Sequence, residues 1–296
     1  MHLSCPSWSF GTQHVTGYLP LEGALRVVAA LGFDACEIGF GHLQPALIAA
    51  RPQREADRVR RVLDETGLEL CDLFPWFATR HTIPPFTWRN CSVNVPDSQA
   101  RREVLELFDA VVRFARAVGS PGITVSSGPV YPELGREGSF EASRTALAEM
   151  VARAHAAGVQ LSIEPHLESP TDSPETTLQM VQEVPGLQVT LDYSHFVAVG
   201  RPTPDGDVLI PHARRVDARQ ARRGKVQCRL EEGEIDFEHV VTALTRAGYR
   251  GTISTEYVCV DYQGCNDLDV VTETLKMKRH IEGLLRKTFP VGVVAP

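Results

Sequence analysis

The sequence predicts an α/β fold, a single (β/α)8 barrel that spans residues 1–296. Short apolar runs alternate with longer amphipathic segments from end to end, and eight strand candidates occur at the spacing of strand–helix units. No Pro/Ser linker or change of composition divides the chain. A doubly wound open sheet is the competing fold, but no GxGxxG follows the first strand.

The predicted elements follow in order along the chain. The strand candidates are residues 2–8, 35–40, 69–74, 122–128, 159–166, 187–194, 214–221 and 252–258. Amphipathic segments with apolar residues at three- and four-residue steps include 20–33, 54–67, 97–119, 139–158 and 236–249. Strand–helix alternation at this spacing predicts parallel strands joined by helical crossovers.

Local signals mark the ends of several predicted helices. Three of them end at a glycine, a residue that can take the left-handed conformation that closes a helix; these are Gly119, Gly158 and Gly248. Residues of the N-cap type precede three helices, namely Asp97, Ser139 and Asp236.

Composition excludes several classes of protein. The net charge of −7 offers no basic surface for nucleic acid or anionic membranes. The seven cysteines form no CxxC pair, which predicts a reduced, cytoplasmic protein. We expect no signal peptide and no membrane span, because no basic region leads an apolar run and no run approaches about 18 residues.

The longest irregular segment, residues 75–96, follows the third predicted strand. Loops of this length in compact domains are usually functional, often as lids. Its aromatic residues are equally compatible with a contact between subunits.

Four acidic residues stand at the ends of four consecutive strands. Glu164, Asp192, Asp217 and Glu256 are separated by 28, 25 and 39 residues, each close to one strand–helix unit. Active sites of such barrels lie at the C-terminal ends of the strands, so the four carboxylates should meet there. One acid alone would equally well cap the next helix.

Carboxylates this close would repel one another unless a positive charge lies among them or some stay protonated. A divalent cation satisfies this requirement, and ligation by oxygen alone favours Mg²⁺, Mn²⁺ or Ca²⁺ over zinc. We therefore expect one divalent cation, Mn²⁺ or Mg²⁺, held by Glu164, Asp192, Asp217 and Glu256.

The segments LSIEPH, LDYSHF, VDARQA, EGEIDF and STEY resemble the xylose-isomerase-like TIM barrel superfamily (sugar phosphate isomerase/epimerase and AP endonuclease family 2 type). The resemblance runs from the first strand to the last helix and is most specific in residues 160–257. It implies a metal-dependent isomerase or epimerase acting on a sugar, sugar phosphate or cyclitol through an enediolate. It also implies a homodimer or homotetramer.

Residue by residue, the resemblance implies that Glu164 and Glu256 are both metal ligands and the catalytic acid and base. Asp192 corresponds to the metal-binding aspartate, His195 to a histidine that faces the substrate, and Arg219 to a basic residue that contacts it. Strand seven departs from the pattern, because Asp217 stands where many relatives have histidine. His212 has the opposite strand parity, so Asp217 is the preferred ligand.

Further residues have a functional interpretation beside a structural one. His166 and His195 would contact the substrate or support a ligand. Trp8 and Trp76 would form an apolar wall for a sugar ring or pack in the core. Glu37 and Asp72 would bind hydroxyls or the barrel rim. The basic run Arg214, Arg215, Arg219, Arg222, Arg223 and Lys225 would recognise an anionic group or form a solvated loop.

Three alternatives remain open. A dehydratase of the same superfamily, of the inosose or dehydroshikimate type, would start from the same enediolate. A non-catalytic sugar-binding barrel is compatible with the change on strand seven. A repair nuclease of the endonuclease IV type would need more clustered histidines and a basic surface.

Overall fold

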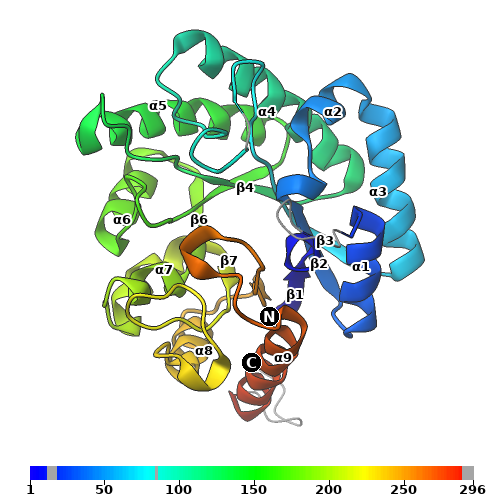
Figure 1. The fold of residues 1–296 in the computed structure, drawn as a ribbon, viewed down its shortest axis with the longest axis vertical. Coiled ribbons are helices and arrows are strands. Elements are labelled where there is room, and N and C mark those ends of the chain that lie inside the picture. The colour runs from blue at the N-terminus through cyan, green and yellow to red at the C-terminus, as the bar shows by residue number, and fades with distance from the viewer. Residues whose placement is uncertain (12–18, 84–85, 289–296) are drawn as a thin grey trace.

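The computed structural model describes residues 1–11, 19–83 and 86–288. Strands β1 to β8 form a closed parallel barrel in which β8 pairs with β1 (Figure 1). They are His2–Pro6, Ala35–Gly39, Glu69–Phe74, Gly122–Ser126, Gln160–Glu164, Leu187–Asp192, Ala213–Asp217 and Thr252–Ser254. The predicted (β/α)8 barrel is confirmed.

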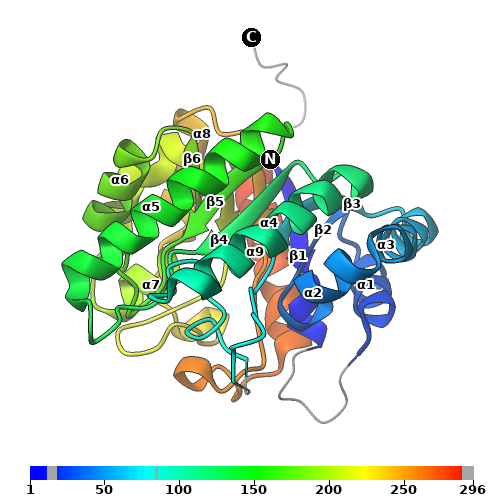
Figure 2. The same ribbon diagram turned by 90° about the horizontal axis from the view of Figure 1, so that it is seen from above.

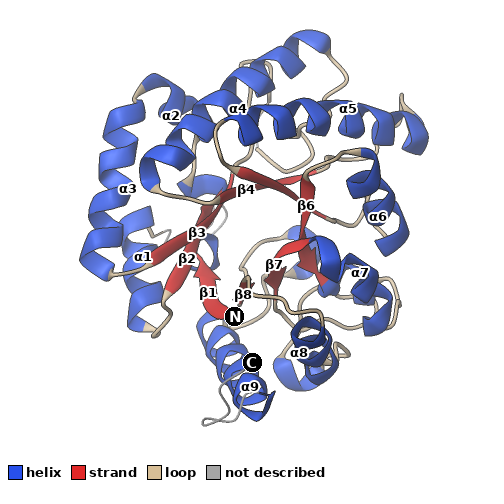
Figure 3. Cartoon of the chain, turned by 180° about the vertical axis from the view of Figure 1, so that it is seen from behind, coloured by secondary structure: helices blue, strands red, loops and turns tan. Residues whose placement is uncertain are grey.

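Helices surround the barrel on its outside, as the cartoon coloured by secondary structure shows (Figure 3). In the described part of the chain, helices α1 to α9 are Leu21–Ala30, Pro45–Ala50, Pro52–Thr66, Ser98–Val118, Gly135–Ala156, Pro174–Glu183, Tyr193–Ala198, Phe237–Arg246 and Val270–Thr288. The five helices predicted above correspond to α1, α3, α4, α5 and α8.

Two of the three predicted N-caps are confirmed. Asp97 and Asp236 each accept the backbone N–H three residues further on. Ser139 is not a cap, because α5 begins earlier, at Gly135, and the Ser139 hydroxyl accepts the N–H of Tyr131 at 2.9 Å. The predicted helix-closing glycines all have positive φ: Gly119, Gly158 and Gly248.

The barrel interior is polar, whereas the outer face of the strands is apolar. In β6, Val189 and Leu191 belong to the apolar core beneath the helices, while the Thr190 hydroxyl lies 2.7 Å from that of Thr124 on β4. Successive residues of a strand point to opposite sides. The period-two alternation therefore directs polar side chains such as Thr190 into the barrel. Thr190 lies two residues before the C-terminal end of β6.

A bulge brings two adjacent arginines into this interior. Val189 pairs with Ala213 and Thr190 with Arg215, so Arg214 is an extra residue in β7. Arg214 consequently reaches Ser162 at 2.6 Å, and Arg215 is 1% exposed. Both guanidinium groups lie among buried carboxylates, which need such partners.

The segments that follow β3 and β8 lie on the same side of the barrel, drawn in cyan and orange at the lower edge of Figure 2. Residues 75–83 and 86–97 contain no helix or strand. Seven of the eight strands end one to four residues earlier than predicted, and β3 ends where it was expected, at Phe74. All seven cysteines lie in the described residues, and none of them forms a disulfide. No described helix has the length and apolarity needed to cross a bilayer.

Candidate active site

The four predicted acids lie where the barrel geometry places them. Glu164, Asp192 and Asp217 are the last residues of β5, β6 and β7, and Glu256 lies just beyond β8. All four are buried, and Asp192 is the register partner of Asp217. Parallel strands that end together at one rim bring distant residues of the chain into one site.

Three of these acids form a tight group. Glu164, Asp192 and Glu256 offer carboxylate oxygens that all lie within 4.8 Å of one another. Asp217 is not a member of that group, and its Oδ2 accepts a hydrogen bond of 2.9 Å from Arg215 Nη2. Its role as a fourth ligand stays a prediction.

The donor set of this group suits a hard cation. Three carboxylate oxygens here are buried and accept no hydrogen bond from the described residues: Oδ1 of Asp217, and Oε2 of Glu164 and of Glu256, whose contacts are ion pairs with His166 and Arg219. Six buried carboxylates face three arginines inside the barrel: the acids are Glu37, Asp72, Glu164, Asp192, Asp217 and Glu256, and the arginines Arg214, Arg215 and Arg219. This excess of negative charge fits the residues to a divalent cation.

Arg219 bridges two of the three grouped acids. Its Nη2 lies 2.6 Å from Asp192 Oδ2, and its Nη1 lies 3.3 Å from Glu256 Oε2. Its Nε donates to the Ser194 hydroxyl at 2.9 Å. Arg219, which was predicted to contact the substrate, therefore forms ion pairs with Asp192 and Glu256 in this structure.

The two predicted histidines stack beside Glu164, with ring centroids 4.5 Å apart. His166 Nε2 lies 3.0 Å from Glu164 Oε2, and His195 Nε2 accepts from Arg219 at 3.1 Å. These histidines and Glu164 form a second group whose ligand atoms lie within 4.8 Å of one another. His195 is fully buried, whereas His166 lines the adjacent cavity.

The pKa values of the two candidate catalytic glutamates shift in opposite directions. Burial, with the nearby charges of Glu164 and Asp192, raises the pKa of Glu256 to about 7 against the opposing effect of Arg219. Burial acts in the same sense on Glu164, but His166 and His195 outweigh it and hold its pKa well below the usual range. Burial and the neighbouring carboxylates raise the pKa of Asp217 despite Arg215.

A cavity of about 300 Å³ opens over Glu164 and Glu256. It is lined by Phe40, Trp76, Phe86, Thr87, Trp88, Arg89, Glu164, His166, Arg219, Glu256, Val258, Val260, Asp261 and Tyr262. Acidic and basic groups thus form its floor, and aromatic rings form much of its wall. Such a mixture is usual for small-molecule sites.

The two predicted tryptophans have different positions. Trp76 lines the cavity and its ring lies 4.7 Å from that of Phe40. Trp8 does not line it: the side chain is fully buried, and its Nε1 donates to Glu256 Oε1 at 2.7 Å. Trp8 therefore contacts a candidate catalytic residue instead of forming a wall.

Several other candidates lie away from the cavity. Glu37 and Asp72 are buried inside the barrel, where Ser4 and Thr124 donate to them and Arg215 lies within 3.7 Å and 3.4 Å respectively. Within the basic run, Arg222 and Arg223 are exposed and do not line the cavity. Arg214 and Arg215 instead pair with buried acids inside the barrel.

Sequence reasoning missed Arg215 as the partner of Asp217 and the cavity residues Phe40, Trp88 and Tyr262. A signal for Arg215 was present, because an arginine two positions before an acid in a strand lies on the same side. Phe40 has φ of 50°, a conformation rare for a bulky residue, which sequence does not reveal.

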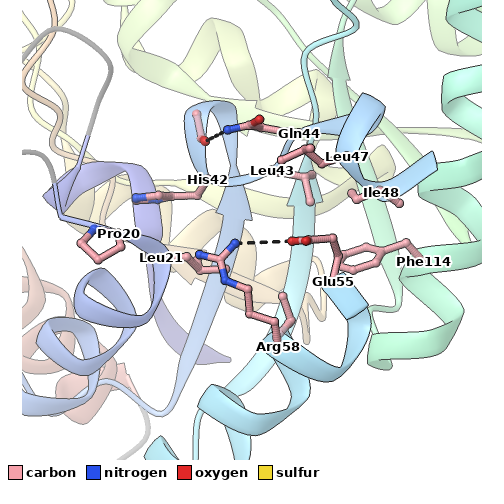
Figure 4. A pocket seen from close by; sticks show the side chains of 12 residues that line it. Pro20, Leu21, His42, Leu43, Gln44, Leu47, Ile48, Glu55, Arg58 and Phe114 are labelled. Carbon is pink, nitrogen blue, oxygen red and sulfur yellow. Dashed lines mark hydrogen bonds and ion pairs between the residues drawn. The ribbon is translucent and has the colours of Figure 1, made fainter. Parts of the chain in front are cut away.

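A second cavity of about 220 Å³ lies outside the barrel between α1, α2, α3 and α4 (Figure 4). Arg58 points into it, contacts Glu55 at 3.4 Å, and forms hydrogen bonds of 2.6 Å and 2.8 Å with Glu22. These contacts join α1 to α3, so the charges here are already paired and serve the packing of the outer layer.

Comparison with known proteins decides the family. The family model described as "Xylose isomerase-like TIM barrel" matches residues 25–281. The chain belongs to this family. The match includes all four acids of this xylose isomerase-like barrel and both histidines beside Glu164.

Individual relatives agree with this assignment. The human protein named "Putative hydroxypyruvate isomerase" is 26% identical over 255 residues, covering 80% of this chain and 83% of that protein. The D-psicose 3-epimerase of Clostridium cellulolyticum H10 superposes with a TM-score of 0.71 at 16% identity, covering 97% of this chain and 98% of that one. For an L-ribulose 3-epimerase the TM-score is 0.71 at 17% identity, with coverage of 100% and 99%. The two structural matches show that this xylose isomerase-like barrel shares their fold.

Proposed function

We propose that this barrel is a divalent-cation-dependent isomerase or epimerase that acts on a sugar or a related polyhydroxylated carbonyl compound by proton transfer. One observation carries the proposal: Glu164 and Glu256 line the same cavity and, with Asp192, place carboxylate oxygens within 4.8 Å of one another. The names of the similar proteins, a hydroxypyruvate isomerase and sugar 3-epimerases, support the same class.

Glu164, Asp192 and Glu256 would hold the cation, with Asp217 the predicted fourth ligand. When bound, a divalent cation polarises a carbonyl and lowers the cost of the enediolate charge. One of the two cavity glutamates would take the proton next to the carbonyl, and the other would return a proton. Return to the opposite face of the same carbon gives epimerisation, and return to the former carbonyl carbon, with the hydroxyl proton passing to the other oxygen, gives isomerisation.

The remaining side chains orient the substrate. Arg219 and His166 line the floor and present N–H groups to substrate oxygens. Trp76 presents an aromatic face suited to the C–H face of a sugar. Among the described cavity residues, Arg89 is the arginine outside the carboxylate network, and it is paired with Glu168.

The test is proton–deuterium exchange in D₂O with Mn²⁺ or Mg²⁺ over a panel of ketoses and inososes, followed by NMR. We expect cation-dependent exchange at the carbon next to the carbonyl, abolished in Glu164→Gln and in Glu256→Gln. Glu133→Gln, at an exposed position, is the matched control and should keep full exchange. Exchange without added cation, or none with any substrate, would contradict the proposal. Loss of water in the same spectra would identify a dehydratase.

A further inference from the structure

Arg219 occupies oxygens that a cation at this site would need. Asp192 Oδ1 accepts the N–H of Ser194 at 2.8 Å, and its Oδ2 lies 2.6 Å from Arg219. Glu256 Oε1 accepts from Trp8, and its Oε2 lies 3.3 Å from Arg219. Every oxygen of these two acids therefore already faces a donor, and one guanidinium group contacts both side chains.

A guanidinium group and a metal ion attract the same carboxylates but repel each other. Arg219 is 5% exposed, so little water lies between these charges to screen the repulsion. Because the guanidinium group of Arg219 already neutralises part of the charge of Asp192 and Glu256, these carboxylates attract a second cation less strongly. The free energy of cation binding must therefore include the cost of weakening or sharing the Arg219 contacts.

Arg219 is suited to this competition, whereas Arg215 is not. Nε of Arg219 donates to the neutral hydroxyl of Ser194, and the side chain borders the cavity. Arg215 lies deeper, among Glu37, Asp72 and Asp217, with its guanidinium 5.9 Å from the ring centre of Trp8. Among the described residues, Arg219 is thus the arginine that contacts Asp192 and Glu256 at the edge of an open space, while His166 contacts Glu164 there.

We propose that Arg219 is a built-in competitor of the divalent cation at Asp192 and Glu256, so that its charge sets the cation affinity of the site. The inference rests on the cation site of the proposed function. It makes Arg219 a positioning and affinity-setting residue, in addition to any contact with substrate.

The test is a Mn²⁺ titration of the purified chain without substrate, with free Mn²⁺ measured by electron paramagnetic resonance. Arg219→Gln removes the charge and should tighten Mn²⁺ binding by about tenfold or more. Arg219→Lys keeps the charge and should remain near the unsubstituted protein. Arg89→Gln is the matched control: this arginine lines the same cavity but pairs with Glu168, so the affinity should not change.

Unchanged or weaker Mn²⁺ binding in Arg219→Gln would overturn the inference. If that variant does not fold by circular dichroism, Ser194→Ala takes its place, because it removes the hydroxyl that holds Arg219 and leaves every carboxylate intact. It should tighten Mn²⁺ binding in the same direction by a smaller factor, and no tightening would again overturn the inference.

The outcomes separate the two proposals. Tighter binding in Arg219→Gln without any deuterium exchange would sink the enzymatic proposal and leave the competition intact. Cation-dependent exchange with unchanged affinity in Arg219→Gln would do the reverse. A wild-type chain that binds no Mn²⁺ would overturn both.

Discussion

Trp8 Nε1 donates a hydrogen bond of 2.7 Å to Oε1 of Glu256, across 248 residues of sequence. Both side chains are buried, and the Trp8 ring is fixed between Phe40 and Phe74 at 4.7 Å and 5.9 Å between ring centroids. The first and last strands of the barrel, which pair with each other, bring the two residues together. The bond fixes one oxygen of Glu256 and leaves Oε2 toward Arg219 and the cavity.

Trp8→Phe should lower kcat by about tenfold with little change in KM, because a buried hydrogen bond to a carboxylate is lost while the aromatic packing is kept. The donor stabilises the charged form of Glu256, so its loss should move the pKa of that residue further upward from about 7. The pH profile of kcat should therefore shift to higher pH, in the same direction as the pKa of Glu256. Phe74→Leu, a neighbour of Trp8 that makes no bond to Glu256, should leave the profile in place.

The location of the four acids could be predicted from sequence because strand order and register are regular. Glu164, Asp192, Asp217 and Glu256 follow from counting strand–helix units and from the rule that sites lie at strand C-termini. Which acids group together could not be predicted, since that depends on side-chain partners. Arg215 donates a hydrogen bond to Asp217, and the one-residue bulge beside it brings Arg214 into the barrel interior as well.

The position of Trp8 shows a different limit. From sequence alone, a tryptophan near a strand end is expected either to line the cavity or to pack in the core. In the structure Trp8 is buried in the core, and its N–H donates to Glu256 of the candidate site. The shortened strands have the same origin, because polar residues after β7 and β8 bond to partners far away in the chain. Long-range partners of this kind have no local sequence signal.

Asp192→Asn should weaken Mn²⁺ binding by at least about 100-fold, because it removes a member of the carboxylate group. Asp217→Asn is the informative comparison, since Asp217 is bonded to Arg215 and lies outside that group. We expect the smaller loss for Asp217→Asn. Equal losses, measured by titration and by metal content after dialysis, would assign Asp217 to the ligand set alongside the other three.

Trp76→Ala should raise KM by about tenfold and leave kcat nearly unchanged, because it removes an aromatic wall of the cavity that touches no reacting group. Ile83→Ala is the control on the same loop: its side chain is 78% exposed and does not line the cavity. Steady-state kinetics on the substrate found by the exchange assay would measure both. A fall in kcat alone for Trp76→Ala would argue against a binding role.

Arg215→Met should destabilise the fold by about 3–5 kcal/mol, because it leaves buried carboxylates without their cation. Arg215 Nη2 bonds to Asp217 at 2.9 Å, and Nη1 lies 3.4 Å from Asp72 and 3.7 Å from Glu37, all inside the barrel. Methionine is similar in length and apolar, so the loss measures charge compensation more than volume. Urea unfolding followed by circular dichroism gives the free energy of unfolding.

The control for that change is Arg26→Met, which breaks the surface pair with Glu65 at 2.7 Å, where both side chains are about half exposed. It should cost no more than about 1 kcal/mol, since water screens the pair. Equal losses in the two variants would show that the buried charge of Arg215 does not stabilise the fold.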